Sequence, residues 1–161
     1  MAVKKLLLDD FFEEEQYILI GIHCTLEDYR LAFLINQVLD IRLKRKQEDV
    51  KFSKDNSSFS LYEFNQEKQH IIYYLVANSC KVKQDQQQDI NSLFSNEAFL
   101  TTNKYLLPEF KKVNYLLKVE TEFPLNKEKL ILNKLLKIPQ IVTAYSIDVD
   151  NLKTKNNLIF N

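Results

Sequence analysis

The 161-residue sequence predicts one α+β domain, residues 1–161, in which two main helices cover one face of a mostly antiparallel sheet. Two segments, 17–46 and 113–147, each show the pattern of a strand, a helix and a second strand. Between them, residues 59–77 contain two strand-like runs separated by a polar turn, which predicts an inserted β-hairpin. A helix with an apolar stripe needs a surface to pack against, and this order of elements suits a ferredoxin-like sandwich.

The first unit begins with the strongest strand prediction, Tyr17–Cys24, YILIGIHC. Its nearly continuous apolar character is typical of a strand that is covered on both faces. Thr25 is a candidate N-cap for a helix over Leu26–Leu39, which carries acidic residues in its first turn. Apolar residues cover most of this helix, so we expect it to be buried on more than one side or to meet a partner. Ile41–Lys46, IRLKRK, follows as a lysine-rich edge strand.

The middle of the chain alternates polar and apolar segments. Lys54–Ser58 reads as a polar turn, and Phe59–Phe64 and His70–Ala77 read as strands. The short polar segment 65–69 predicts that these two strands form a hairpin. Lys83–Asn91, KQDQQQDIN, is the most polar stretch and predicts an exposed loop.

The second unit spans residues 113–147. Val113–Glu120 alternates between apolar and more polar residues, among them Lys118, and therefore predicts a strand. A helix is predicted over residues 126–137, with Asn126 as its N-cap, because its leucines and isoleucine fall within one arc. Pro139 ends that helix, and the β-branched and aromatic residues of Ile141–Ile147 predict the closing strand.

The composition argues against several classes of protein. Equal numbers of basic and acidic residues, 22 of each, weaken any prediction of general nucleic-acid or anionic-membrane binding. Gly21 is the only glycine, which excludes a glycine-rich phosphate loop. No apolar run approaches the roughly 20 residues that a membrane-spanning helix needs. The run Met1–Leu8 is too short for a secretory signal, and Cys24 and Cys80 form no Cys-x-x-Cys motif, so we expect a cytoplasmic protein.

Residues Leu107–Tyr115, LPEFKKVNY, resemble the motif that names the IPExxxVDY family, a group of bacterial proteins without an assigned function. Leu107 stands where the motif has Ile, and Asn114 stands where it has Asp. The other motif positions match: Pro108, Glu109, Val113 and Tyr115. The stretches KLLLDDF, IHCTLEDYRLAFLIN and NLKTKNNLIF are also similar to that family, so the resemblance covers most of the chain. It implies a cytoplasmic protein of the Bacteroidetes type without a known activity or cofactor, and Asn114 argues against an obligatory carboxylate there.

Glu109 in this motif has two interpretations. It is a candidate general base or cation ligand beside Tyr115, or it caps a turn or pairs with Arg30. A binding site would require Arg30, Glu109 and Tyr115 to converge in one cleft. The sequence names no catalytic residue, no metal ligand and no cofactor, because its histidines and cysteines form no closely spaced ligand pair and adjacent strand residues point to opposite faces.

A basic run offers a candidate RNA contact. Lys44 and Arg45 lie within the run RLKRK, and four aromatic residues could provide a stacking surface on the sheet. These aromatic residues are Tyr62, Phe64, Tyr73 and Tyr74. The alternative is a solvated edge strand and an aromatic core, which the zero net charge favours.

The sequence favours a non-enzymatic protein-interaction or regulatory module that acts through protein association, with a homodimer as its simplest form. The broadly apolar first helix and the lack of a convergent set of catalytic residues motivate this hypothesis. One alternative is an ACT-like small-molecule sensor, because KIPQIVTAYSID resembles the end of such units. The other alternative is an RNA-binding protein.

Overall fold

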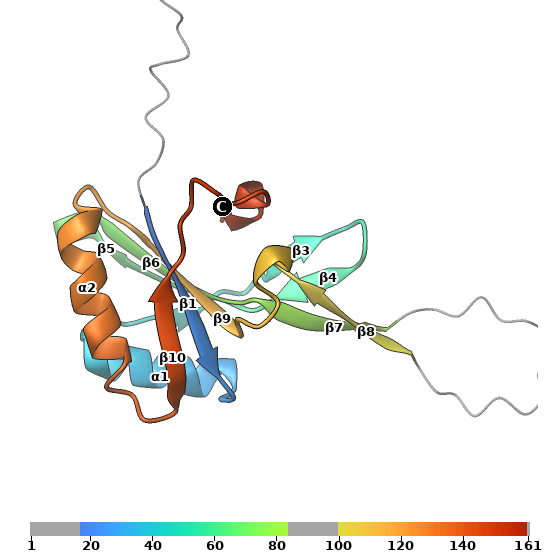
Figure 1. The fold of residues 1–161 in the computed structure, drawn as a ribbon, viewed down its shortest axis with the longest axis horizontal. Helices are drawn as coiled ribbons and strands as arrows, with labels where there is room; N and C mark the ends of the chain where they lie inside the picture. The colour runs from blue at the N-terminus through green and yellow to red at the C-terminus, as the bar shows by residue number, and fades with distance from the viewer. Residues whose placement is uncertain (1–16, 84–99, 161) are drawn as a thin grey trace, which may run out of the picture.

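The computed structural model describes residues 17–83 and 100–160, which form a mixed α+β fold with mostly antiparallel strands and two α-helices (Figure 1). The main sheet has six strands in the order β10-β1-β9-β6-β5-β2, and every neighbouring pair is antiparallel. Its strands are β1 Tyr17–Cys24, β2 Lys44–Arg45, β5 Leu61–Gln66, β6 Ile71–Ala77, β9 Tyr115–Glu120 and β10 Ile141–Ser146. The remaining elements are the hairpins β3 Val50–Phe52 with β4 Ser57–Phe59 and β7 Ser79–Lys83 with β8 Thr101–Tyr105, the helices α1 Asp28–Leu39 and α2 Pro124–Leu135, and the 3-10 turns η2 Glu67–Gln69, η3 Pro108–Phe110 and η4 Lys155–Leu158.

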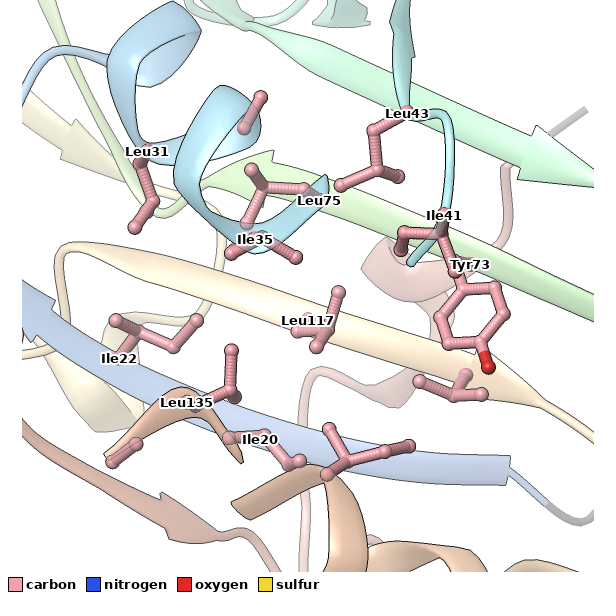
Figure 2. Close-up of a cluster of buried hydrophobic side chains, with 14 of the residues drawn as sticks. Ile20, Ile22, Leu31, Ile35, Ile41, Leu43, Tyr73, Leu75, Leu117 and Leu135 are labelled. Carbon is pink, nitrogen blue, oxygen red and sulfur yellow. The ribbon is translucent and has the colours of Figure 1, made fainter. Parts of the chain in front are cut away.

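Helices α1 and α2 share one hydrophobic core with the sheet, as predicted. Both helices contact each other, and α2 also packs against β1 and β10. Figure 2 shows the buried side chains of this core: Leu31 and Ile35 of α1, Leu135 of α2, Ile20 and Ile22 of β1, Leu75 of β6 and Leu117 of β9. Burial of each such side chain is worth about 1.5–3 kcal/mol relative to its exposure, so this face supplies a large share of the fold's stability.

The opposite face of the sheet has its own core, to which neither α1 nor α2 contributes a buried residue. Leu19, Val76 and Leu116 on this face are covered by the segment before β9 and by the chain after β10. The covering side chains are Leu106, Leu107, Val113, Ile147, Leu152 and Leu158. Strand β1 is therefore buried on both faces, which confirms the interpretation of its continuous apolar sequence.

Gly21 lies at the centre of β1, where a side chain has little room. A Cβ atom at this position would lie 3.1 Å from Ile147 Cδ1 and 3.1 Å from Val113 Cγ2. The glycine thus lets the covering segments approach the sheet closely.

Both predicted N-caps are wrong. Helix α1 begins at Asp28 and its N-cap is Glu27 rather than Thr25, because the Glu27 carbonyl accepts the first helical hydrogen bonds. Helix α2 begins at Pro124, so Asn126 lies inside it. Proline suits the first helical position because its φ is preset and its missing N–H has no partner there anyway. The helix also ends at Leu135 rather than at residue 137.

The predicted strand Ile41–Lys46 pairs with the sheet only at Lys44–Arg45. Lys46 N also donates to Leu61 O at 2.9 Å, whereas Ile41 and Leu43 hydrogen-bond to helix α1. The Asn36 side chain accepts a hydrogen bond from Leu43 N at 2.8 Å and donates one to Leu43 O at 3.2 Å. Ile41 and Leu43 are buried in the helix-side core, which holds this stretch out of the ladder.

The β5–β6 hairpin is confirmed, but the elements around it differ from the prediction. The predicted turn over Lys54–Ser58 ends at Asn56, and Ser57 already belongs to β4, which pairs with β3. The Asp55 carboxylate shapes this turn by accepting hydrogen bonds from the Ser57 backbone and hydroxyl. The β7–β8 hairpin, which Figure 1 shows extending beyond β6 and β9, was not predicted. Of the predicted loop Lys83–Asn91, all but Lys83 lies outside the described residues.

Candidate functional site

The LPEFKKVNY segment connects β8 to β9 and is organised around Asn78, which follows β6 and is fully buried. The Asn78 amide donates hydrogen bonds to Phe110 O at 2.8 Å and to Val113 O at 2.9 Å, and its oxygen accepts one from Leu107 N at 2.8 Å. Its own backbone groups bind Asn114 O and Leu106 N. Asn78 therefore holds the whole segment in place, and sequence reasoning missed it. The available signal was a single amide at the end of the apolar run IIYYLVA.

Glu109 lies in η3 and caps a turn of the C-terminal segment. Its Oε1 accepts hydrogen bonds from Lys153 N at 2.9 Å, from Thr154 N at 2.9 Å and from Thr154 Oγ1 at 3.1 Å. Its Oε2 accepts a further bond from Lys153 N at 3.2 Å. A carboxylate that receives two successive backbone amides acts as a cap does at a helix start. Both of its oxygens are thereby engaged in joining the motif to the end of the chain.

The final residues of the motif join β9 to the end of β1. Asn114 Oδ1 accepts a hydrogen bond from Cys24 N at 3.0 Å, a role that an amide oxygen fills as well as a carboxylate. The Tyr115 hydroxyl donates to Leu26 O at 2.6 Å, just before α1. Burial raises the pKa of the Tyr115 hydroxyl and also that of the Cys24 thiol.

Arg30, Glu109 and Tyr115 do not share a hydrogen bond or an ion pair in the part of the chain that the structure describes. Tyr115 packs against the helix-side core, and Arg30 is exposed on α1. Glu109 binds the C-terminal segment, whose Leu152 belongs to the core of the opposite face. Glu109, Asn114 and Tyr115 of the motif therefore each hold one part of the fold to another.

The two basic candidates lie at the β2 edge of the sheet. The Arg45 guanidinium forms an ion pair with Asp49, lies 5.6 Å from the centroid of the Tyr62 ring and donates to Leu61 O at 3.4 Å. Lys44 is exposed and lies opposite Glu63 in the β2–β5 pair. Glu63 Oε2 forms an ion pair with Lys46 Nζ at 2.8 Å. The charges of this edge are thus largely balanced within the chain.

The four aromatic residues of the candidate stacking surface do not form one exposed face. Tyr62 and Tyr73 are buried in the helix-side core, where the Tyr73 ring stacks on Phe64 with centroids 6.2 Å apart. Tyr74 is buried on the opposite face, 5.2 Å from the Phe160 ring. Burial raises the pKa of Tyr62 and of Tyr73.

Lys118 lies in β9 and is 3% exposed, although the sequence alternation groups it with the more polar residues of the strand. Its ammonium group donates to Glu120 Oε1 at 2.5 Å and to Leu158 O at 3.0 Å. Three ring centroids surround the nitrogen, at 4.6 Å for Tyr17, 5.5 Å for Phe160 and 5.7 Å for Tyr74. The carboxylate and the ring faces compensate the buried charge. Lys118 therefore anchors the end of the chain to the middle of the sheet.

Large apolar side chains are exposed on three elements of the described chain. On α1, Tyr29 is 59% exposed and Phe33 is 61% exposed, and the two are one helical turn apart. On α2, Leu130 is exposed, and on β10 Val142 is 78% exposed. These exposed apolar side chains are candidates for contact with another molecule.

Among residues 17–83 and 100–160, no cluster of three or more His, Cys, Asp and Glu side chains is arranged to hold a metal ion. None of the helices in these ranges has the length and apolar character needed to cross a membrane. Comparison of the chain with protein-family models, with curated proteins and with solved structures finds no match.

Proposed function

We propose that this chain is a non-enzymatic protein-association module. The observation that carries the proposal is the aromatic pair Tyr29 and Phe33, both more than half exposed on the outer side of α1. Leu31 and Ile35 of the same helix are fully buried, so the helix has apolar residues on both its inner and its outer side. Paired large apolar residues at a surface are typical of a site where another protein binds.

The energy of such a contact is sufficient for association. Each large apolar side chain that moves from water into an interface contributes about 1.5–3 kcal/mol. Rigid aromatic residues lose little conformational entropy when they bind, which is why they are frequent at interfaces. Leu130, Leu136 and Val142 add further exposed apolar area outside α1.

The polar residues support a non-enzymatic role. The carboxylate of Glu109, the hydroxyl of Tyr115 and the guanidinium of Arg45 each bind another part of the fold. A catalytic group needs a free face toward a substrate, and general acid–base chemistry requires hydrogen-bonding reach to the reacting atom. The partners of these three groups are backbone atoms and side chains of the same chain.

We further propose that the domain is a ferredoxin-like sandwich of a cytoplasmic IPExxxVDY family protein. The strand order β10-β1-β9-β6, with α1 after β1 and α2 between β9 and β10, supports the sandwich, and β5 and β2 extend that sheet beyond β6. The residues of LPEFKKVNY support the family. The free thiols of Cys24 and Cys80 support a reducing compartment.

Sedimentation equilibrium of the purified chain tests the association proposal. We expect concentration-dependent association that weakens in the double variant Tyr29→Lys/Phe33→Lys. The control is Gln37→Lys, which adds one lysine at an exposed polar position of α1, as each of the two substitutions does. A wild-type chain that stays monomeric and binds no dye specific for exposed apolar surface would contradict the proposal.

A further inference from the structure

The two edges of the main sheet differ in their resistance to pairing. At one edge, β2 pairs over only Lys44–Arg45, and charged side chains crowd it. At the other edge, β10 has the sequence IVTAYS, six residues without a charge. Short, charged edges are typical of strands that must not pair further, whereas a long uncharged edge is a template for another strand.

The backbone of β10 offers free groups along its outer side. Ile147 N donates to Leu19 O at 2.8 Å, so the amide of residue 147 points toward β1. Backbone direction alternates along an antiparallel strand, which turns the N–H and C=O groups of Ala144 and Ser146 away from β1. Strand β1 is the partner of β10 within the described chain, so these groups lie on the open edge.

We propose that β10 pairs antiparallel with β10 of a second copy of this chain, so that the two sheets become continuous. This inference rests on the proposed function and names the surface for self-association. A two-fold axis beside Ala144 would place Ala144 of one copy opposite Ala144 of the other and Tyr145 opposite Thr143. Such an interface is self-complementary, and each sheet is already antiparallel throughout.

The charges along the chain select a second copy as the occupant. Self-pairing brings identical residues together at the centre of the interface. Like charges would repel each other there, but IVTAYS contains no charged residue. It also brings the start of each strand near the end of the other. Lys137 precedes β10, and Asp148 and Asp150 follow it, and all three are exposed. In the pair, Lys137 of each copy would therefore lie near the acidic residues of the other.

The side chains of the edge fit the same arrangement. Tyr145 lies beside His23 with ring centroids 5.5 Å apart and keeps an exposed side. An aromatic residue opposite a β-branched residue, here Thr143, is a favourable cross-strand pair. The irregularity between His23 and Cys24 places an extra residue, Val142, at the start of β10. The regular ladder with β1 therefore begins at Thr143, and Val142 lies opposite Ser146 of the second copy.

Ser146→Pro tests the inference because it removes an outward N–H and leaves the hydrogen bonds to β1 in place. We expect self-association about tenfold weaker or more in sedimentation equilibrium, since two symmetric backbone bonds are lost per pair. The matched control Ser146→Ala keeps the N–H and should associate as the wild type does. Val142→Lys, at an exposed position, adds a charge to the edge and should also weaken association without unfolding.

A charge exchange tests the orientation. Lys137→Glu should weaken association at low salt, and combination with Asp150→Lys should restore it, because the pair then has its charges reversed. If the wild type associates and Ser146→Pro and Val142→Lys associate as tightly, the edge inference is wrong while the proposed function stands. If only Tyr29→Lys/Phe33→Lys disrupts the complex, the interface is on α1 instead. A monomeric wild type without dye binding removes both proposals.

Discussion

Glu109 and Thr154 are 45 positions apart, and the Glu109 carboxylate accepts hydrogen bonds from both the backbone N–H and the hydroxyl of Thr154. Together with the bonds from Lys153 N, these contacts connect the LPEFKKVNY segment to the turn that precedes η4. The C-terminal segment covers the face of the sheet opposite α1 and α2, so this connection closes the second core.

Glu109→Ala should destabilise the fold by about 1 kcal/mol, because two backbone amides and a hydroxyl lose their acceptor near solvent. Glu109→Gln keeps one acceptor oxygen and should cost less. Urea unfolding followed by circular dichroism measures the free energy of unfolding. A catalytic Glu109 without a capping role would leave this free energy unchanged in both variants.

Asn78→Leu should be more damaging than either Glu109 variant. The substitution leaves Phe110 O, Val113 O and Leu107 N without their partner in a buried site. We expect a loss of about 3 kcal/mol or more, since each buried unsatisfied group costs about 1–3 kcal/mol. The same urea experiment checks it, with Asn65→Leu at an exposed position of β5 as the control. Equal stability of the two variants would show that Asn78 does not organise the segment.

The pattern of apolar residues was sufficient to predict the strands and helices that are buried in the cores. Tyr17–Cys24 was bounded correctly because its apolar run is buried on both faces, and Ile141–Ile147 differed from β10 by one residue. The helices were found, but their starts were not, because the prediction looked for a polar N-cap at Thr25 and Asn126, whereas Glu27 and Phe123 precede the helices without a side-chain cap. Such errors concern boundaries rather than the kind of element.

The candidate site was beyond sequence reasoning because its contacts join distant segments. Nothing in the sequence spacing indicates that Asn78 meets Val113 or that Glu109 meets Thr154, and both contacts are made to backbone atoms of other segments. The alternation of Val113–Glu120 groups Lys118 with the more polar residues of the strand and does not indicate its burial, because lysine is rarely buried. Its environment depends on Phe160 and Leu158 at the end of the chain. Local patterns carry no information about such long-range partners.

Lys118→Met should loosen the C-terminal segment. The substitution keeps the apolar volume but removes the donor to Leu158 O and the ion pair with Glu120. We expect faster amide hydrogen exchange over η4 and faster tryptic cleavage after Lys155, with the exchange of β9 less affected. The control is Lys127→Met, which removes a lysine from α2 instead of from β9. Unchanged exchange over η4 would show that Lys118 does not anchor the segment.

Tyr115 should make the fold less stable at alkaline pH. Burial raises the pKa of its hydroxyl in the folded state, so above the ordinary tyrosine pKa of about 10 the unfolded chain loses a proton that the folded chain retains. The stabilisation is present below that pH and is lost as the pH rises toward the folded pKa, by up to about 1.4 kcal/mol per pH unit for this group. Tyr115→Phe should cost about 1 kcal/mol at neutral pH, because the hydrogen bond to Leu26 O is lost, and should flatten the alkaline decline. Tyr145→Phe, at a partly exposed position, is the control, and urea unfolding between neutral and strongly alkaline pH measures both effects. If Tyr115→Phe showed the same alkaline decline as the wild type, the decline would have to come from other buried groups such as Tyr73 or Cys24.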